Sequence, residues 1–97
     1  MLTSKQKQLL KSEAHHLKPV VHIGKQGVTD ALAQELDVVL DSLELIKIKL
    51  NQNTFEDKAS TVKALVGKLP GLEHVWTIGR TILLFRPSRT HPTKFLI

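Results

Sequence analysis

Apolar and polar residues recur along this chain with two different periods, which divide it into short helices and strands. Over residues 4–17, apolar side chains return every three or four positions and so share one face of a helix. Thr3 and Gln6 have the spacing of a capping box at its start, and Pro19 disfavours helical geometry at the residue before it. Residues 19–23 are mostly apolar and β-branched, which is typical of a strand. The chain therefore begins with a helix followed by a strand.

The centre of the chain repeats this order with a clearer signal. The pattern over residues 29–43 predicts a helix with an apolar stripe on one side and acidic residues on another. Residues 45–50 change to period two, so successive side chains point to opposite faces of a strand. We expect Ile46, Ile48 and Leu50 to point into the core, and Lys47 and Lys49 to point to the other face of the sheet.

A third helix and a hairpin complete the pattern. An apolar stripe over residues 55–69 predicts the helix, Thr54 and Asp57 suit its start, and a Pro-Gly pair ends it. A strand over residues 74–78, a two-residue Gly-Arg turn and a strand over residues 81–86 predict the hairpin. The resulting order, α-β-α-β-α-β-β, predicts an α/β fold with two layers and a four-stranded mixed sheet.

The sequence predicts a single domain over residues 1–97. A chain of 97 residues is long enough to bury one core without help from metals or disulfides, and its apolar fraction of 41% indicates a globular protein. We expect residues 87–97, which contain two prolines and no period, to form a tail laid over the body of the protein. The anchor of this tail would be Phe95, Leu96 and Ile97.

The composition narrows the classes of function. The absence of cysteine excludes a disulfide framework, a zinc site with thiolate ligands and a catalytic thiol. The N-terminal residues lack the apolar stretch of a signal peptide, and no apolar run reaches the roughly 18 residues that a membrane span needs. We therefore expect a soluble, monomeric protein of the cytoplasm with no membrane partner.

The net charge of +5 is distributed unevenly along the chain. Residues 1–28 and residues 74–97 each carry +4, whereas residues 29–45 contain five acidic residues and no Lys or Arg. Binding to a polyanion depends on a local patch of charge more than on the total. The uneven distribution therefore favours a polyanionic partner such as a nucleic acid.

The sequence offers little material for catalysis or metal binding. Asp37 and Asp41 stand one helical turn apart, but paired acids are routine on solvated helix faces. His15 and His16 are adjacent and so point about 100° apart on a helix, and no metal-binding or nucleotide-binding spacing is present. We therefore expect no enzymatic activity, no metal site and no cofactor.

A glycine loop, Gly24-Lys25-Gln26-Gly27, separates the first strand from the second helix. Glycine lets the backbone approach a ligand closely because no Cβ intervenes, and KH domains use a G-x-x-G loop to hold the backbone of about four nucleotides. The same residues also suit a tight turn that needs glycine for its dihedral angles. Asp30, in the first turn of the following helix, would repel a phosphate.

Basic side chains recur on several predicted elements, while the acidic ones concentrate on one helix. Only four aromatic residues are present, so base stacking has little material, and recognition of the RNA backbone and shape is favoured. Structured RNA is therefore a better candidate for the ligand than a stacked single strand. Besides the glycine loop, the candidate contacts are Lys7, Lys11 and Lys18 on the first helix, Lys47 and Lys49 on the second strand, Arg80 in the hairpin turn and Arg86 after it, with Arg89 in the tail.

Three motifs occur in order: residues 17–29 (LKPVVHIGKQGVT), residues 44–49 (ELIKIK) and residues 78–87 (IGRTILLFRP). They closely resemble the CRM domain (chloroplast RNA splicing and ribosome maturation), in particular its small bacterial stand-alone members of the YhbY type, and the similarity extends over residues 2–87. The resemblance implies an α/β fold like that of the C-terminal domain of translation initiation factor 3, RNA binding, and association with precursors of the large ribosomal subunit. It also implies RNA contacts at Gly24, Lys25, Gln26 and Gly27, and basic contact positions at Lys47, Lys49, Arg80 and Arg86.

Two hypotheses of different classes remain open. The first is a non-enzymatic RNA-binding protein that binds structured rRNA of pre-50S particles and acts in ribosome assembly, with ribosomal proteins as further partners. The second is a protein-interaction module whose acidic helix, over residues 29–43, docks a basic partner such as a ribosomal protein.

Overall fold

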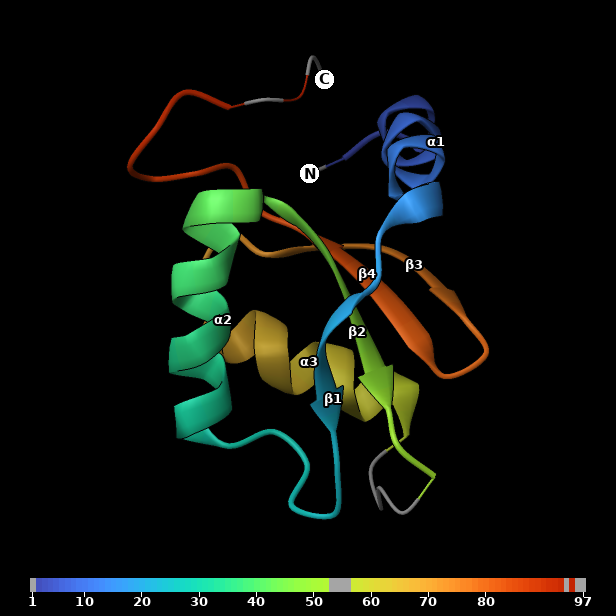
Figure 1. The fold of residues 1–97 in the computed structure, drawn as a ribbon, viewed down its shortest axis with the longest axis vertical. Coiled ribbons are helices and arrows are strands. Elements are labelled where there is room, and N and C mark those ends of the chain that lie inside the picture. Colours follow the sequence, from blue (N-terminus) through green and yellow to red (C-terminus); the bar gives the residue numbers. More distant parts are fainter. Residues whose placement is uncertain (1, 53–56, 94, 96–97) are drawn as a thin grey trace.

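Four strands form one mixed sheet: β1 (Pro19–Ile23), β2 (Leu45–Leu50), β3 (Glu73–Ile78) and β4 (Thr81–Phe85). The computed structural model describes residues 2–52, 57–93 and 95. The strands lie in the order β1-β2-β4-β3 (Figure 1). β1 and β2 are parallel, whereas β4 pairs antiparallel with β2 on one side and with β3 on the other. The predicted mixed sheet of four strands is confirmed.

Three helices flank the sheet: α1 (Ser4–Glu13), α2 (Asp30–Leu43) and α3 (Lys58–Lys68), and a 3-10 turn, η1 (Ala14–His16), extends α1. The predicted capping box is present, because the Gln6 N–H donates to Thr3 Oγ1 at 3.1 Å and the Thr3 N–H donates to Gln6 Oε1 at 2.8 Å. The side chains of Thr29 and Asp57 cap α2 and α3 by accepting hydrogen bonds from the N–H groups of Leu32 and Ser60. Each helix thus begins where the sequence supplies an acceptor for its first free N–H groups.

Helix α3 begins at Lys58, directly after its cap at Asp57. The other predicted features of this start, Thr54 and Phe55, lie outside the described residues. In the residues that the structure describes, no helix is long and apolar enough to cross a membrane.

The helices lie on both faces of the sheet. α2 and α3 cover one face, and Ile46, Ile48 and Leu50 point into the core beneath them, as predicted. α1 packs on the opposite face over a second, smaller cluster. The buried members of this second cluster are Leu10, Ala14, Leu45, Val75, Leu83 and Phe85.

The position of α1 adds a layer to the predicted two-layer arrangement. Its apolar stripe buries Leu10 against the sheet face that carries Lys47 and Lys49. The sequence pattern does not indicate this packing, because the side chains that β2 places on this face change from apolar to basic along the strand. Leu45 at the start of β2 is buried, and the two lysines follow it. A helix therefore covers only the half of this face near Leu45, and Lys49 at the other end is exposed.

The hairpin of β3 and β4 contains two local irregularities. Gly79, in its two-residue turn, has a φ of +57°, which favours glycine. The pairing shifts register between His74 and Trp76, and such a bulge places two residues opposite one. As a result Val75 is buried under α1, whereas Trp76 lies outside the core and is 39% exposed.

Candidate nucleic-acid interface

The glycine loop connects β1 to α2 and projects beyond one end of the sheet (Figure 1). The Gly27 N–H donates to the Gly24 carbonyl oxygen at 3.0 Å, which closes a tight turn with Lys25 and Gln26 exposed at its tip. The N–H groups of Lys25 and Gln26 donate to no acceptor in the described part of the chain. Two adjacent backbone donors without an acceptor in the described residues therefore lie in an exposed turn that also carries a lysine.

The two glycines of this loop have different structural requirements. Gly27 has a φ of +68°, in the left-handed region that favours glycine, so the turn itself requires it. Gly24 has no positive φ, and a Cβ built on it would meet Asn51 Nδ2 at 3.7 Å, which is an ordinary van der Waals distance. The turn thus accounts for Gly27 but leaves Gly24 unexplained. A small residue at Gly24 is what close approach of a ligand to the loop backbone requires.

The sheet brings basic residues of two other strands to this loop. The Asn51 N–H donates to the Ile23 carbonyl at 2.8 Å, so the end of β2 lies directly beside the start of the loop. Arg80 follows next, since its Nε donates to the Leu50 carbonyl at 2.8 Å and its Nη2 donates to the Asn51 carbonyl. We call this part of the molecule the loop end, and it consists of Gly24, Lys25, Gln26, Lys49, Asn51 and Arg80.

Asp30, which the sequence places against an incoming phosphate, forms an ion pair with Lys68 at the protein surface. Lys68 Nζ lies 2.5 Å from Asp30 Oδ1, and this hydrogen bond with its accompanying charge attraction lowers the pKa of Asp30. Much of the negative charge at the start of α2 is thereby balanced by Lys68. The N-terminus of α2 therefore repels a phosphate less than the sequence suggests.

The remaining predicted lysines are spread over the molecule. Lys47 points to the α1 side of the sheet, where its Nζ donates to the Leu17 carbonyl at 3.0 Å, and Lys11 Nζ lies 4.1 Å from the centroid of the Trp76 ring. Lys7 is close enough to His74 for its charge to lower the pKa of that imidazole, after the larger effect of burial. Lys18 precedes β1 and so lies about 17 Å from the loop, the length of a five-residue strand.

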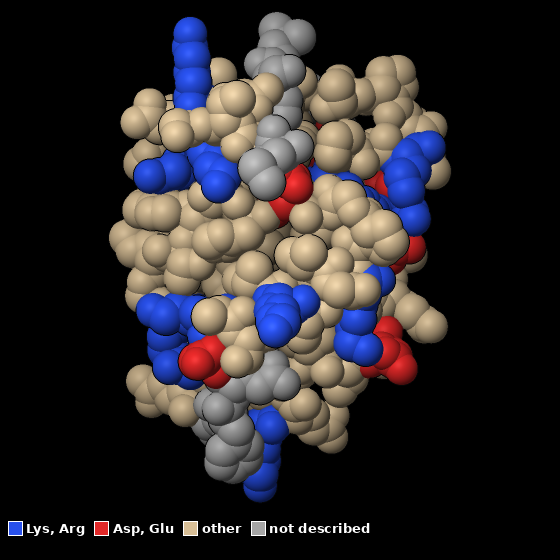
Figure 2. Space-filling model, turned by 180° about the vertical axis from the view of Figure 1, so that it is seen from behind, with Lys and Arg blue, Asp and Glu red and all other residues tan. Residues whose placement is uncertain are grey.

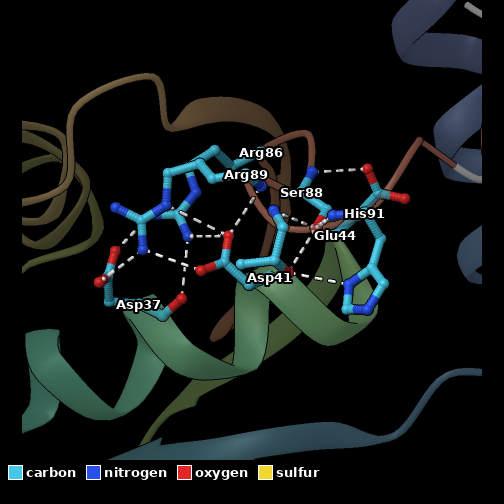
Figure 3. A network of polar contacts seen from close by, with 8 residues as sticks. Asp37, Asp41, Glu44, Arg86, Ser88, Arg89 and His91 are labelled. Carbon is cyan, nitrogen blue, oxygen red and sulfur yellow. Dashed lines mark hydrogen bonds and ion pairs between the residues drawn. The ribbon is translucent and has the colours of Figure 1, made fainter.

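Arg86 differs from the predicted set of RNA contacts because its side chain is only 3% exposed. Its Nη1 lies 2.6 Å from Asp37 Oδ1, and its Nη2 donates to the Asp37 carbonyl at 2.9 Å and to Asp41 Oδ1 at 3.1 Å (Figure 3). A guanidinium held in this way cannot reach RNA without breaking a buried ion pair. Arg86 thus joins the end of β4 to α2, and the predicted RNA contact at Arg86 would require this pairing to open.

The acidic face of α2 is occupied by the chain's own tail. Arg89 Nη2 pairs with Asp37 Oδ2 at 2.8 Å and with Asp41 Oδ2 at 2.9 Å, and the Ser88 N–H donates to Glu44 Oε2 at 2.7 Å (Figure 3). Hydrogen bonds from Arg86 and then Arg89 lower the pKa of Asp37, and those from Arg89 lower the pKa of Asp41.

Sequence reasoning missed this pairing and treated the two aspartates as a solvated face. The available signal was charge complementarity between the acidic segment and two arginines three positions apart.

Figure 2 shows the side of the molecule opposite to that in Figure 1, towards which α3 faces. Its Lys and Arg side chains form separate groups divided by uncharged surface, and the few acidic side chains visible there lie near basic ones. Among the described residues, no three His, Cys, Asp or Glu side chains are placed to hold a metal ion.

Comparison with known proteins identifies the family. Residues 2–86 match the CRS1 / YhbY (CRM) domain. The chain is 45% identical over 89 residues to a Bacillus subtilis (strain 168) protein named "Probable RNA-binding protein YqeI", with 92% of each chain covered. It is 41% identical over 87 residues to a Haemophilus influenzae protein named "RNA-binding protein", covering 90% of this chain and 87% of the relative.

A solved structure shows the same fold. The solution structure of SAV1595 from Staphylococcus aureus superposes with a TM-score of 0.75 at 38% sequence identity, and the match covers 92% of each chain. The matched residues include all eight elements from α1 to β4 and the glycine loop between them. The family that the three sequence motifs resembled is thus confirmed: this chain belongs to the CRS1 / YhbY (CRM) domain family.

Proposed function

We propose that this protein binds structured RNA through the loop end, that the RNA is rRNA of precursors of the large ribosomal subunit, and that the protein acts in the assembly of that subunit. The family and the names of the relatives support RNA as the ligand. The observation that carries the choice of site is the tip of the glycine loop, where Lys25 and Gln26 are exposed and their N–H groups donate to no acceptor in the described part of the chain.

The loop end combines two kinds of phosphate contact. The N–H groups of Lys25 and Gln26 have no acceptor in the described part of the chain, and successive backbone donors in a tight turn can form a concave anion site. Lys25, in the turn itself, and Lys49, near the end of β2, are both exposed and add positive charge to the loop end. Contacts of this kind position the protein on an RNA backbone without reading its sequence.

Arg80 has a more limited role because its guanidinium already donates to two carbonyls at the end of β2. Five N–H donors are available to an arginine, so the remaining ones can still meet a phosphate. The two hydrogen bonds to the backbone hold this charge in place beside the loop. A guanidinium that is fixed in advance loses less conformational freedom when RNA binds.

A charge reversal with a matched control tests the site. Lys25→Glu should weaken binding to structured rRNA about tenfold at 0.1 M salt, because one phosphate contact is worth a factor of about five and the new carboxylate adds repulsion. Lys63→Glu is the control, since it makes the same charge change on the exposed surface of α3, away from the loop end. Equal effects of the two variants in a filter-binding assay would refute the site.

The role in assembly needs a separate experiment. Cell extract is fractionated on a sucrose gradient, and RNA crosslinked to the protein is sequenced from each fraction. We expect the protein to migrate with large-subunit precursors and to crosslink to their rRNA. Migration with free proteins only would contradict the assembly role while leaving RNA binding itself intact.

The alternative, in which the acidic helix docks a basic partner, receives little support from the geometry. Asp37 and Asp41 are already paired with Arg86 and Arg89, and Asp30 is paired with Lys68. A basic partner would have to displace these side chains.

A further inference from the structure

The half of the sheet face that α1 leaves open carries an exposed tryptophan beside a basic hollow. Trp76 and Ile78 of β3 are 39% and 56% exposed, although both are large apolar side chains. They line a hollow of about 180 Å³ between the end of α1 and the hairpin. Lys11, His15, Lys47 and Leu83 also line it.

Burial in the core does not explain the indole at this position. The bulge in β3 places Val75 and Trp76 opposite Leu83, and Val75 is the one that fills the apolar cluster under α1. Trp76 is left outside, where its ring is in contact with the ammonium group of Lys11. An exposed aromatic ring beside a hollow offers a face on which a flat ligand can stack.

The charge around the hollow selects the kind of ligand. Two lysines and one histidine line it, and none of the side chains that line it is acidic. A hollow with one aromatic wall and basic edges matches a nucleotide, whose base is a flat ring and whose phosphate is an anion. An apolar peptide matches the apolar character of the wall and an acidic peptide matches the basic edges, but neither has the flat surface that stacks on an aromatic ring.

We propose that this hollow binds an unpaired base of the RNA, stacked on the Trp76 indole, with the adjoining phosphate held by Lys11 and Lys47. This inference rests on the proposed function, because it assumes that RNA reaches the loop end. Trp76 is paired with Leu83 of β4, and Leu83 lies two residues after Thr81, the first residue of that strand. The hollow therefore lies about 7 Å along β4 from the end of the strand that follows Arg80. One RNA molecule can therefore contact both places.

The contact between Lys11 and Trp76 keeps the ammonium group of Lys11 close to where the base and its phosphate would bind. A cation–π contact at an exposed position is weaker than the stacking of a base on an aromatic ring, so a base displaces the ammonium group from the ring. The released Lys11 is then free to bind the phosphate of the same nucleotide. The small number of aromatic residues led us to expect little base stacking. One exposed aromatic residue is nevertheless enough to stack a single base beside a structured RNA.

Intrinsic fluorescence tests the proposal directly, since Trp76 is the only tryptophan of the chain. The wild-type protein is titrated with a fluorescein-labelled RNA hairpin that has a single-stranded extension, with the same hairpin lacking the extension, and with a version whose extension has no bases. Anisotropy of the label reports binding, and tryptophan emission reports stacking. We expect all three RNAs to bind, but only the extension with bases to quench Trp76.

Two variants distinguish the contribution of the aromatic ring to binding from that of an apolar side chain. Trp76→Phe keeps an aromatic face, whereas Trp76→Leu keeps an apolar side chain of strand-compatible size without one. Trp76→Leu should bind the extended hairpin about tenfold more weakly than the wild type and bind the blunt hairpin with unchanged affinity, and Trp76→Phe should lie within about threefold of the wild type for both. Circular dichroism confirms that each variant is folded.

The possible failures are distinguishable. Saturated binding of the extended hairpin without a change in tryptophan emission, or equal affinities of Trp76→Leu and the wild type, would overturn the stacking site while leaving RNA binding at the loop end in place. The absence of any anisotropy change with all three RNAs would overturn the proposed function, and this inference with it.

Discussion

Replacement of Arg86 by methionine should destabilise the protein and leave its affinity for RNA unchanged. The Arg86 side chain is 3% exposed and makes three hydrogen bonds to α2, two of them to carboxylates. Removal of one partner from a buried ion pair costs about 3–5 kcal/mol, because the other charge stays buried without compensation. We place Arg86→Met near the lower end, at about 3 kcal/mol, because the side chains of Asp37 and Asp41 are 34% and 16% exposed and Arg89 still pairs with both.

Arg89→Met is the matched control, since Arg89 pairs with the same two carboxylates but is 54% exposed. Ion pairs of exposed side chains contribute little to stability, so the control should lose only a small part of what Arg86→Met loses. The free energy of unfolding is measured by urea titration followed by circular dichroism. A domain of this size has about 5–15 kcal/mol of stability, so both variants remain folded at 25 °C.

The two results that would refute this reasoning are specific. Equal unfolding free energies for the two variants would mean that burial of Arg86 does not strengthen its ion pairs. A loss of RNA affinity in folded Arg86→Met, without a similar loss in Arg89→Met, would restore Arg86 to the RNA-contact set that the family resemblance implies.

Three further predictions follow from the loop and from the ionisable groups. Gly24→Ala should fold as stably as the wild type but bind RNA more weakly. Gly27→Ala should lose about 1 kcal/mol of stability, because Gly27 has a φ of +68°. Equal stabilities of these two variants in urea titrations would contradict this prediction. Burial, assisted by Lys7, lowers the pKa of His74 below 6.5, so the unfolded chain binds more protons and stability should fall as the pH drops below about 6.5. His74→Gln should remove that slope between pH 7.5 and 5.5, and an unchanged slope would refute the assignment. If about five phosphates are neutralised, the logarithm of the RNA affinity should fall with the logarithm of the salt concentration at a slope of about −3.5. Lys25→Glu should reduce the magnitude of that slope by about 0.7. A slope near zero would exclude phosphate binding.

Much of the fold follows from the sequence because its signals are local. The capping box of Thr3 and Gln6, and the alternation in β2, act within a few residues, and both were correctly assigned. The side of the sheet on which α1 packs depends on contacts between residues distant in the chain. Leu10, for example, is buried in one cluster with Phe85, and no local period indicates such a pairing.

The candidate site was predictable in part for the same reason. The glycine loop is a local motif, and the structure shows Lys25 exposed at its tip. The roles of Arg86 and Trp76 depend on their surroundings in space. Asp37 and Asp41, which are distant from Arg86 in the sequence, pair with this buried arginine, and a bulge in β3 leaves Trp76 outside the core.

The most direct test of RNA binding at the loop end is an NMR titration of the ¹⁵N-labelled protein with a fragment of large-subunit rRNA. We predict that the largest chemical-shift changes fall on the backbone amides of Gly24, Lys25 and Gln26 and on those of Lys49 and Arg80, while the amides of α3 remain unchanged. Shifts that concentrate on α2 and α3 and leave the glycine loop unaffected would contradict the account.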